Sequence, residues 1–235
     1  MSNNGSINQE EYLKQYNPDK YEKLSVTVDV LIFSIIDNKI CVRLVKRERP
    51  PFENMLSIPG TFVKPTESLD DAVKRVLREK AGFDDIYCEQ LFTWGDVNRD
   101  PRMRIISVSY ISFLSEESLA LIKTKQEINA EFYEVDPYIG DIKEKLAFDH
   151  NRILESARQR MAAQAENMDI AFEFMPQRFT LPRFQKITEI LLGRELYKAN
   201  FRKKVQDKVV ETGEYTSGDA YRPSMLYTRC PDGEK

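Results

Sequence analysis

The segment between residues 60 and 83 reads Gly60-Thr-Phe-Val-Lys-Pro-Thr-Glu67-Ser-Leu-Asp-Asp-Ala-Val-Lys-Arg75-Val76-Leu-Arg-Glu79-Lys80-Ala-Gly82-Phe83. Apolar residues recur in its second half at the intervals of one helix face. They are Leu69, Ala72, Val73, Val76 and Leu77. The spacing predicts a helix over Ser68–Ala81 that stops at Gly82.

Strand-like segments flank this helix on both sides. A run rich in β-branched residues, an Asp37-Asn38 turn and a segment of alternating apolar residues precede it. The predicted strands are Val26–Ile36, Ile40–Val45, Ile86–Thr93, Ile105–Leu114 and Glu131–Val135, with a further helix from Asp149. The pattern predicts a mixed sheet with at least one helix packed on it, an α+β or α/β sandwich. A polar arm precedes the body over residues 1–20, with a short helix at Gln9–Tyr16.

The C-terminal third has a different texture. Thr180 is placed to cap a helix over Leu181–Leu192 that Gly193 ends, and a second helix follows over Lys198–Lys208. Two strand-like pieces over Val209–Arg229 complete the order of a winged helix-turn-helix. Residues 178–235 carry 12 Lys and Arg against 8 Asp and Glu, whereas residues 1–177 have a net charge of −7. Chance variation of charge along the chain explains this asymmetry as well as a separate basic module does. The helix pattern, and not the charge, therefore predicts the module.

Composition excludes several classes of protein. The 235 residues are 41% hydrophobic and 31% charged, as in a soluble globular protein. The longest apolar run, Val30–Phe33, is far shorter than the roughly 20 residues of a membrane span. Three scattered cysteines and an N-terminus without the order of a secretion signal predict a cytoplasmic location and no zinc site. The single histidine, His150, excludes any mechanism that needs two, and its position is typical of a helix start or an interdomain contact.

The segment from Gly60 to Phe83 resembles a Nudix box. That motif reads Gly, five residues, Glu, seven residues, Arg-Glu-apolar, one residue, Glu-Glu, one residue, Gly-apolar. Aligned from its end, this chain keeps Glu67, Arg75, Leu77, Glu79 and Gly82-Phe83. It departs at three positions: Thr61 replaces the first glycine, Val76 the glutamate after the arginine, and Lys80 the last glutamate.

The last two departures remove carboxylates. Positions 76, 79 and 80 of a regular helix share one side, where carboxylates would hold Mg²⁺. Valine, glutamate and lysine leave no surplus negative charge there, so we expect no metal, no catalytic residue, and hydrolysis that is absent or very weak. Both replacements also have a purely structural explanation, since Val76 extends the apolar stripe and a lysine suits the last turn of a helix.

Nearly the whole chain, from Glu22 to Arg229, resembles the Nudix-related transcriptional regulators of the NrtR family. The supporting segments are Val26–Phe33, Leu44–Arg47, Gly95–Arg102, Arg104–Tyr110, Leu146–His150, Phe179–Pro182 and Asn200–Lys203. The resemblance implies a Nudix-like α/β/α sandwich with a mixed sheet, fused to a C-terminal winged helix. It implies a dimeric bacterial repressor whose effector is ADP-ribose, acting on genes of NAD metabolism. A sugar-responsive branch, for arabinose use, shares this architecture.

A Nudix-like domain fused to a winged helix divides the chain into four predicted segments: an arm at 1–20, an effector domain at 21–148, a linker helix region at 149–176 and a DNA-binding domain at 177–235. A phosphate-bearing effector needs cations and donors in a cleft. The candidates are Arg47, Arg49, Glu67, Glu79, Trp94, Arg99, Arg102 and Arg104. Trp94 or Phe92 would stack on an adenine, although a core position explains either ring equally well. Arg75 is expected to pair with an acidic neighbour instead.

The DNA-binding face follows from a helical wheel. With Phe201 and Val205 inward, the outward side chains suit base edges and phosphates. The candidates are Lys198, Asn200, Arg202, Lys203 and Gln206. Arg222-Pro223 resembles the Arg-Pro wing of the NrtR family, which implies that Arg222 lies near the DNA backbone or minor groove. A solvated helix face is the plain alternative for the basic triplet. Two other functions stay open: a Nudix hydrolase of ADP-ribose or a related nucleoside diphosphate, and a nucleotide-binding adaptor without DNA contacts.

Overall fold

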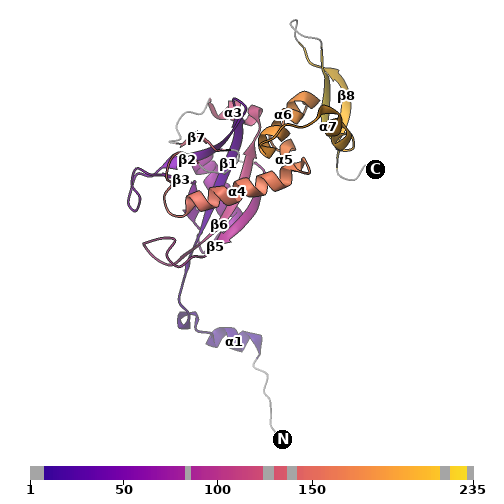
Figure 1. Ribbon diagram of the computed structural model, residues 1–235. Coiled ribbons are helices and arrows are strands. Elements are labelled where there is room, and N and C mark those ends of the chain that lie inside the picture. The colour runs from indigo at the N-terminus through magenta and orange to yellow at the C-terminus, as the bar shows by residue number, and fades with distance from the viewer. Residues whose placement is uncertain (1–7, 83–85, 124–129, 137–141, 218–222, 232–235) are drawn as a thin grey trace.

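The computed structural model describes residues 8–82, 86–123, 130–136, 142–217 and 223–231. A sheet body lies in the middle, an N-terminal arm projects from one end, and a helical module with its own hairpin lies at the other (Figure 1). The arm carries α1 (Gln9–Gln15) and the single turn η1 (Pro18–Lys20), and neither has a buried residue.

The body is built on one mixed sheet. Its strands are β1 (Ser25–Ile36), β2 (Lys39–Lys46), β3 (Leu56–Ser57), β4 (Gly60–Phe62), β5 (Cys88–Trp94), β6 (Ile105–Leu114) and β7 (Ala130–Glu134). The order is β3-β2-β1-β6-β5, with β4 also paired to β1 and β7 to β2. The pair β1–β6 is parallel and every other pair in this sheet is antiparallel.

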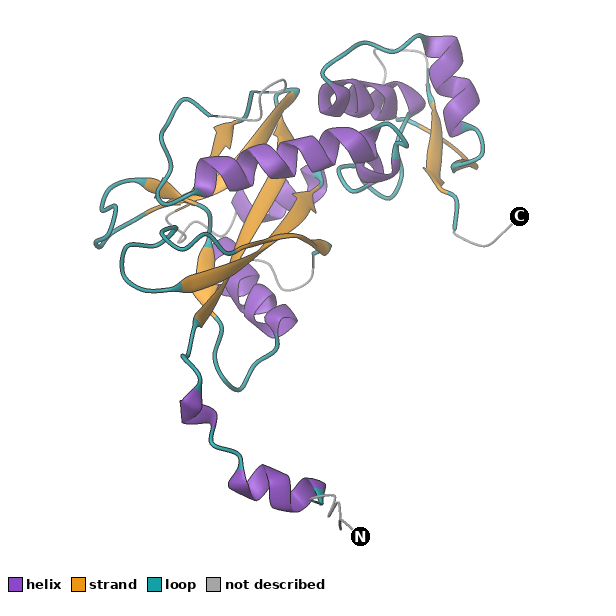
Figure 2. Cartoon of the chain, turned by 60° about the horizontal axis from the view of Figure 1, so that its bottom comes forward, coloured by secondary structure: helices purple, strands orange, loops and turns teal. Residues whose placement is uncertain are grey.

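Strand β1 divides the core in two because successive side chains point to opposite faces of a sheet. Val28, Val30 and Ile32 pack under α2 (Leu69–Val76). Leu31 and Phe33 belong to the core on the other face, beneath α4 (His150–Ala165). Figure 2 shows helices on both sides of the strands. The predicted α/β/α sandwich with a mixed sheet is therefore confirmed.

Helix α2 begins with a capping box. The Ser68 side chain accepts from the Asp71 N–H, and Asp71 accepts from the Ser68 N–H. The predicted regular helix does not continue to its end, because residues 77–81 form a π turn, η2 (Leu77–Ala81). Gly82, with φ of 78°, ends that turn by donating its N–H to the Leu77 carbonyl. Wider turns of this kind are frequent at functional sites.

The core on the α4 side of the sheet continues without interruption into the C-terminal module. After α4 come α5 (Asp169–Phe172), α6 (Leu181–Leu192) and α7 (Lys198–Val205), followed by the hairpin β8 (Val209–Tyr215) and β9 (Met225–Arg229). Phe184 lies among Phe172, Phe179 and Phe201, with ring centroids 4.4, 5.3 and 5.8 Å away. Backbone hydrogen bonds between Phe179 and Tyr227 join the hairpin to the segment before α6. The predicted winged helix-turn-helix is confirmed.

Several details correct the predictions. The sequence reading did not identify β3, β4, α5 or α3 (Glu116–Lys123), because two- to four-residue elements and a weakly amphipathic helix give little periodic signal. Helix α7 ends at Val205 rather than Lys208, since residues 206–208 form a turn that leads into β8. No helix in the described part of the chain combines the length and apolar character of a bilayer crossing.

Candidate functional site

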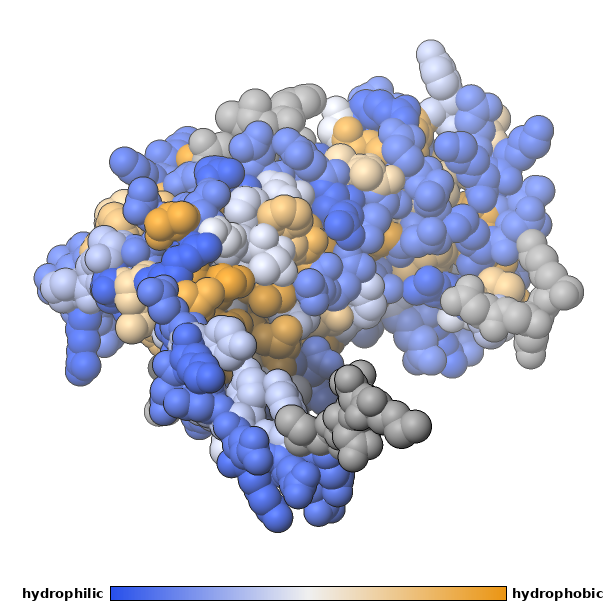
Figure 3. All heavy atoms as spheres, turned by 90° about the horizontal axis from the view of Figure 1, so that it is seen from below, coloured by the Kyte–Doolittle hydropathy of each residue, from blue (hydrophilic) through white to orange (hydrophobic). Residues whose placement is uncertain are grey.

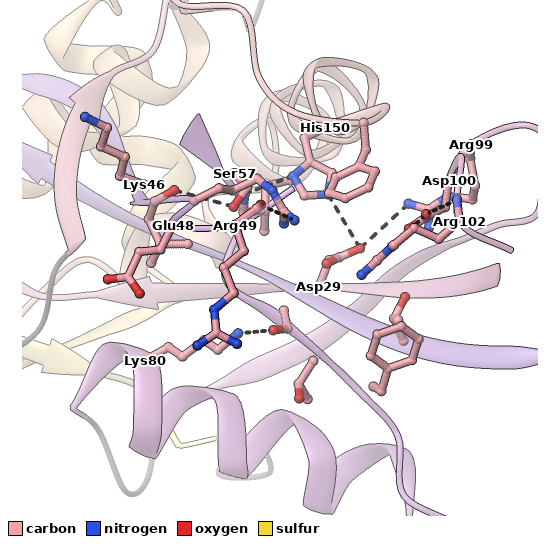
Figure 4. A pocket seen from close by; sticks show the side chains of 18 of the residues that line it. Asp29, Lys46, Glu48, Arg49, Ser57, Lys80, Arg99, Asp100, Arg102 and His150 are labelled. Carbon is pink, nitrogen blue, oxygen red and sulfur yellow. Dashed lines mark hydrogen bonds and ion pairs between the residues drawn. The ribbon is translucent and has the colours of Figure 1, made fainter. Parts of the chain in front are cut away.

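A pocket of about 600 Å³ opens on the sheet body (Figure 4). Its lining comes from strands β1 to β4, the loop between β2 and β3, the η2 turn, the loop between β5 and β6, and the segment that leads into α4. The polar and charged lining residues are Thr27, Asp29, Lys46, Arg47, Glu48, Arg49, Ser57, Thr61, Glu79, Lys80, Arg99, Asp100, Arg102 and His150. Six cationic side chains therefore face four carboxylates. This balance favours an anionic ligand.

Gly60 is fixed by the close approach of β4 to β1. It pairs with Asp29, and a Cβ at this position would lie 2.1 Å from Asp29 Oδ1 and 2.8 Å from the Val28 carbonyl oxygen. Only glycine fits there. The first glycine of the Nudix-box resemblance thus has a physical role, although it stands one position before its expected place.

Asp29 is the centre of a buried polar network. It is 7% exposed, and the Ser107 hydroxyl donates a hydrogen bond to its Oδ2. Arg99 Nη2 lies 3.8 Å from the same oxygen. Arg99 also donates two hydrogen bonds to the Asp149 carboxylate, at 2.7 and 3.0 Å. The network therefore joins β1, β6, the β5–β6 loop and the residue before α4.

His150 presents a defined nitrogen to this network. Its Nδ1 accepts a hydrogen bond from the Ile58 N–H at 2.9 Å, so the proton of the neutral ring is on Nε2. Nε2 lies 4.0 Å from Asp29 Oδ2. Burial lowers the pKa of the imidazole, which Asp29 and Asp149 only partly oppose. The pocket thus contains a neutral N–H donor at the first residue of α4, the helix start that the sequence predicted.

Two aromatic rings and two arginines form one wall. The Arg47 guanidinium lies 4.8 Å from the centroid of the Phe148 ring, and Arg102 lies 5.7 Å from that ring and 5.5 Å from Phe62. Arg102 also donates to Asp100 at 2.7 and 3.0 Å. Guanidinium groups held over rings are preorganised to meet a planar or phosphate-bearing ligand.

Of the eight predicted effector residues, the pocket brings together Arg47, Arg49, Glu79, Arg99 and Arg102. The other three, Glu67, Trp94 and Arg104, lie outside this lining, and each has another partner. Trp94 is buried and donates its indole N–H to Ser109 Oγ at 2.9 Å, and Arg104 donates to the Asp96 carbonyl. Phe92, the alternative stacking ring, packs on Trp94. The rings that do line the pocket are Phe62 and Phe148.

Glu67, the third residue outside the lining, pairs with Arg75 as a brace for the box loop. Arg75 donates to both Glu67 carboxylate oxygens and to the Phe62 carbonyl, and the Lys64 N–H donates to Glu67 Oε1. The Arg75 hydrogen bond, followed by that of Lys64, lowers the pKa of Glu67 to about 2. The expectation that Arg75 holds this loop by an acidic neighbour is confirmed.

The residues at the Nudix metal positions do not fit a divalent cation. Val76 is fully buried in the core beneath α2, so positions 76, 79 and 80 do not share one side as the regular helix predicted. The Lys80 ammonium donates to the Gly60 carbonyl oxygen, and Glu79 lies 3.9 Å from the Arg75 guanidinium. Hard cations of this kind need several oxygen ligands, and here one carboxylate stands between two cationic side chains.

The second site predicted from the sequence is the face of α7. Phe201 and Val205 are buried, whereas Lys198, Asn200, Arg202, Lys203 and Gln206 are all exposed, as the helical wheel predicted. Gln206 stands at the C-cap rather than inside the helix. Arg222 lies outside the described residues. Tyr197, at the N-cap, is 83% exposed and was not identified from the sequence.

On the face seen from below, hydrophobic residues gather over the sheet body, whereas hydrophilic residues cover most of the C-terminal module (Figure 3). That module still exposes the hydrophobic residues Tyr197, Val210 and Tyr215.

Fold and pocket together define a Nudix domain joined to a winged helix. A profile of the NUDIX domain matches residues 25–156, and a profile of the NrtR DNA-binding winged helix domain matches residues 171–228. The chain is 31% identical over 220 residues to an ADPR responsive transcriptional repressor of Acinetobacter baylyi, covering 92% of this chain and 86% of that protein. The chain belongs to the NrtR family of transcriptional regulators.

Solved structures show the same relationship. NrtR of Shewanella oneidensis complexed with a 27mer DNA is 30% identical, with a TM-score of 0.76, covering 88% of this chain and 94% of that one. Its NUDIX domain complexed with ADP ribose is also 30% identical, with a TM-score of 0.55, covering 66% and 99%. An ADP-ribose pyrophosphatase of Methanocaldococcus jannaschii is 33% identical over 143 residues, which are 61% of this chain and 77% of that protein.

Proposed function

We propose that this protein is a repressor that binds operator DNA through α7 and the β8–β9 wing and senses ADP-ribose in the Nudix pocket. The observation that carries the proposal is the charge of the pocket, where six cationic side chains face four carboxylates. A diphosphate suits that lining, whereas a neutral sugar such as arabinose does not. The exposed basic face of α7 on the same chain supplies the second half of the function.

Helix α4 connects the two sites. It begins with His150 in the pocket lining and spans 16 residues, or about 24 Å, to Ala165. The next residue, Glu166, accepts two hydrogen bonds from Arg194 in the turn between α6 and α7. A ligand that moves the start of α4 therefore acts on a helix whose other end contacts the DNA-binding module. Such a ligand changes DNA affinity only if it binds the two arrangements unequally.

We further propose that the Nudix domain binds ADP-ribose without hydrolysing it. Val76 is buried and Lys80 is cationic, so the helix supplies no cluster of carboxylates to activate water through a metal. The likeness to an ADP-ribose pyrophosphatase favours the competing function, a hydrolase. Incubation with ADP-ribose and Mg²⁺ distinguishes them, because turnover of about 1 s⁻¹ or faster, an ordinary enzymatic rate, would establish the hydrolase.

The test of the regulatory function is a DNA-retention titration with the upstream region of the protein's own gene cluster. We expect retention without ligand, weaker retention with ADP-ribose, and no change with arabinose. A response to arabinose alone would assign the chain to sugar sensing. Equal retention on an unrelated duplex would contradict operator recognition. No retention of either duplex would favour a nucleotide-binding adaptor without DNA contacts.

Four further features belong to this proposal. The protein acts as a homodimer, on genes of NAD metabolism, in the cytoplasm where operator DNA is found. Its segments are an arm at 1–20, an effector domain at 21–148, a linker helix region at 149–176 and a DNA-binding domain at 177–235. Size-exclusion chromatography with light scattering tests the dimer, and a monomer that still retains operator DNA would contradict it.

A further inference from the structure

Lys80 places a positive charge among oxygen atoms at the edge of the pocket. Its ammonium donates to the Gly60 carbonyl oxygen, and the charges of Asp29 and Glu79 act on it (Figure 4). Gly60 itself lies against Asp29, as the 2.1 Å clash of an added Cβ shows. The cation thus bonds to one carbonyl oxygen, and the charges of two carboxylates oppose the loss of its proton.

These are the ligand types that a hard divalent cation prefers. The side chain of residue 80 fills that environment with an ammonium. An ammonium carries three N–H donors, and the one bond to Gly60 does not exhaust them. Burial lowers the pKa of Lys80, since desolvation disfavours the charged form, and an arriving phosphate would offset that cost.

We propose that the Lys80 ammonium takes the place of a divalent cation in this pocket and binds the diphosphate of the effector directly, so that effector binding needs no metal. This inference rests on the proposed function, because it assumes a nucleoside diphosphate ligand. An ammonium neutralises phosphate charge but does not convert water to hydroxide as a bound metal does. One substitution would then account for both retained binding and lost turnover.

The test is isothermal titration of the full chain with ADP-ribose, once with EDTA and once with excess Mg²⁺. We expect the same dissociation constant in both buffers, within about a factor of two. Lys80→Met keeps the apolar stem and removes the charge. It should weaken binding by about tenfold to a hundredfold in both buffers, the usual range for a hydrogen bond to a charged group.

Lys74→Met is the matched control, since Lys74 is exposed on α2 and does not line the pocket. We expect it to bind like the unaltered chain. Circular dichroism melting of both variants distinguishes lost binding from lost folding. Binding by the unaltered chain that requires Mg²⁺ would overturn the inference, as would equal affinities for Lys80→Met and Lys74→Met. No binding in either buffer would instead contradict the proposed function.

Discussion

Arg99 and Asp149 form a bidentate ion pair that fastens the β5–β6 loop to the start of α4. The two hydrogen bonds measure 2.7 and 3.0 Å, and the side chains are only 4% and 10% exposed. Asp29 Oδ2 lies 3.8 Å from Nη2 of the same guanidinium. One buried arginine therefore neutralises two carboxylates that the sequence separates by 120 residues.

Replacing Arg99 should lower the free energy of unfolding. Arg99→Ala leaves Asp29 and Asp149 buried without their shared cation, and breaking a buried pair in this way costs about 3–5 kcal/mol of unfolding free energy. Urea denaturation followed by circular dichroism measures the loss. Arg152→Ala is the control, because its pair with Asp96 is 63% exposed on both sides and solvent screening leaves it little effect on stability. Equal losses for the two variants would show that the Arg99 network is not a structural centre.

The buried imidazole predicts a pH dependence of stability. Burial lowers the pKa of His150 below its reference value of 6.5, so the unfolded chain binds the proton more readily. The contribution of the neutral His150 ring to the unfolding free energy is therefore complete above pH 6.5. It declines as the pH falls below that value, until the folded chain takes up the proton as well. Melting temperatures across this range provide the measurement.

His150→Gln provides the comparison for that slope. Its amide oxygen is able to accept from the Ile58 N–H, as Nδ1 does now, and it does not titrate. Because the chain has no other histidine, the variant should lose most of the slope between neutrality and the carboxylate range. A steeper decline for the variant than for the unaltered chain would contradict the assignment of a neutral, buried ring.

The aromatic cluster beneath α7 is the next feature to test. Phe184 is fully buried and contacts rings from α5, the segment before α6, and α7. Phe184→Ala should cost about 3–5 kcal/mol, as large-to-small changes of buried aromatics do, and should abolish DNA retention. Phe92→Ala removes a ring that is 56% exposed and should change stability little. DNA retention by Phe184→Ala at full affinity would show that the cluster does not hold the recognition helix.

Periodicity predicted the larger elements because each has one face against a core. The alternation in β1 and the apolar stripe of α2 separate two clusters of buried residues. Short strands such as β3 and β4 escaped because two or three residues do not show a period. The π turn at residues 77–81 was not predicted for another reason. It changes the residue spacing that a helical wheel assumes, and this change becomes visible only because Val76 is buried in the core.

The pocket was harder to predict than the fold. Arg47, Arg99 and Arg102 were found because cations in adjacent loops are visible in a sequence. Asp29 was not predicted as a site residue, although a carboxylate inside an apolar strand is visible in the sequence. Phe148 and His150 come from the end of a loop and the start of α4, far along the chain, and periodicity does not give the path of a loop. The sequence therefore identified four arginines and one glutamate of the site without the residues that orient them.

The DNA contact predicted for α7 is tested by charge. Arg202→Ala combined with Lys203→Ala should abolish operator retention without unfolding the protein, because both side chains are exposed while Phe201 and Val205 hold the helix. Lower salt strengthens DNA binding, so the double variant is then measured at low salt; if both side chains contact phosphates, its salt slope will be smaller by about 1.8, at 0.9 for each phosphate. Lys143→Ala combined with Lys145→Ala removes the same charge from exposed positions of the sheet body and is the control. Equal salt slopes for the two double variants would mean that DNA senses only net charge, and that the face of α7 is an ordinary solvated surface.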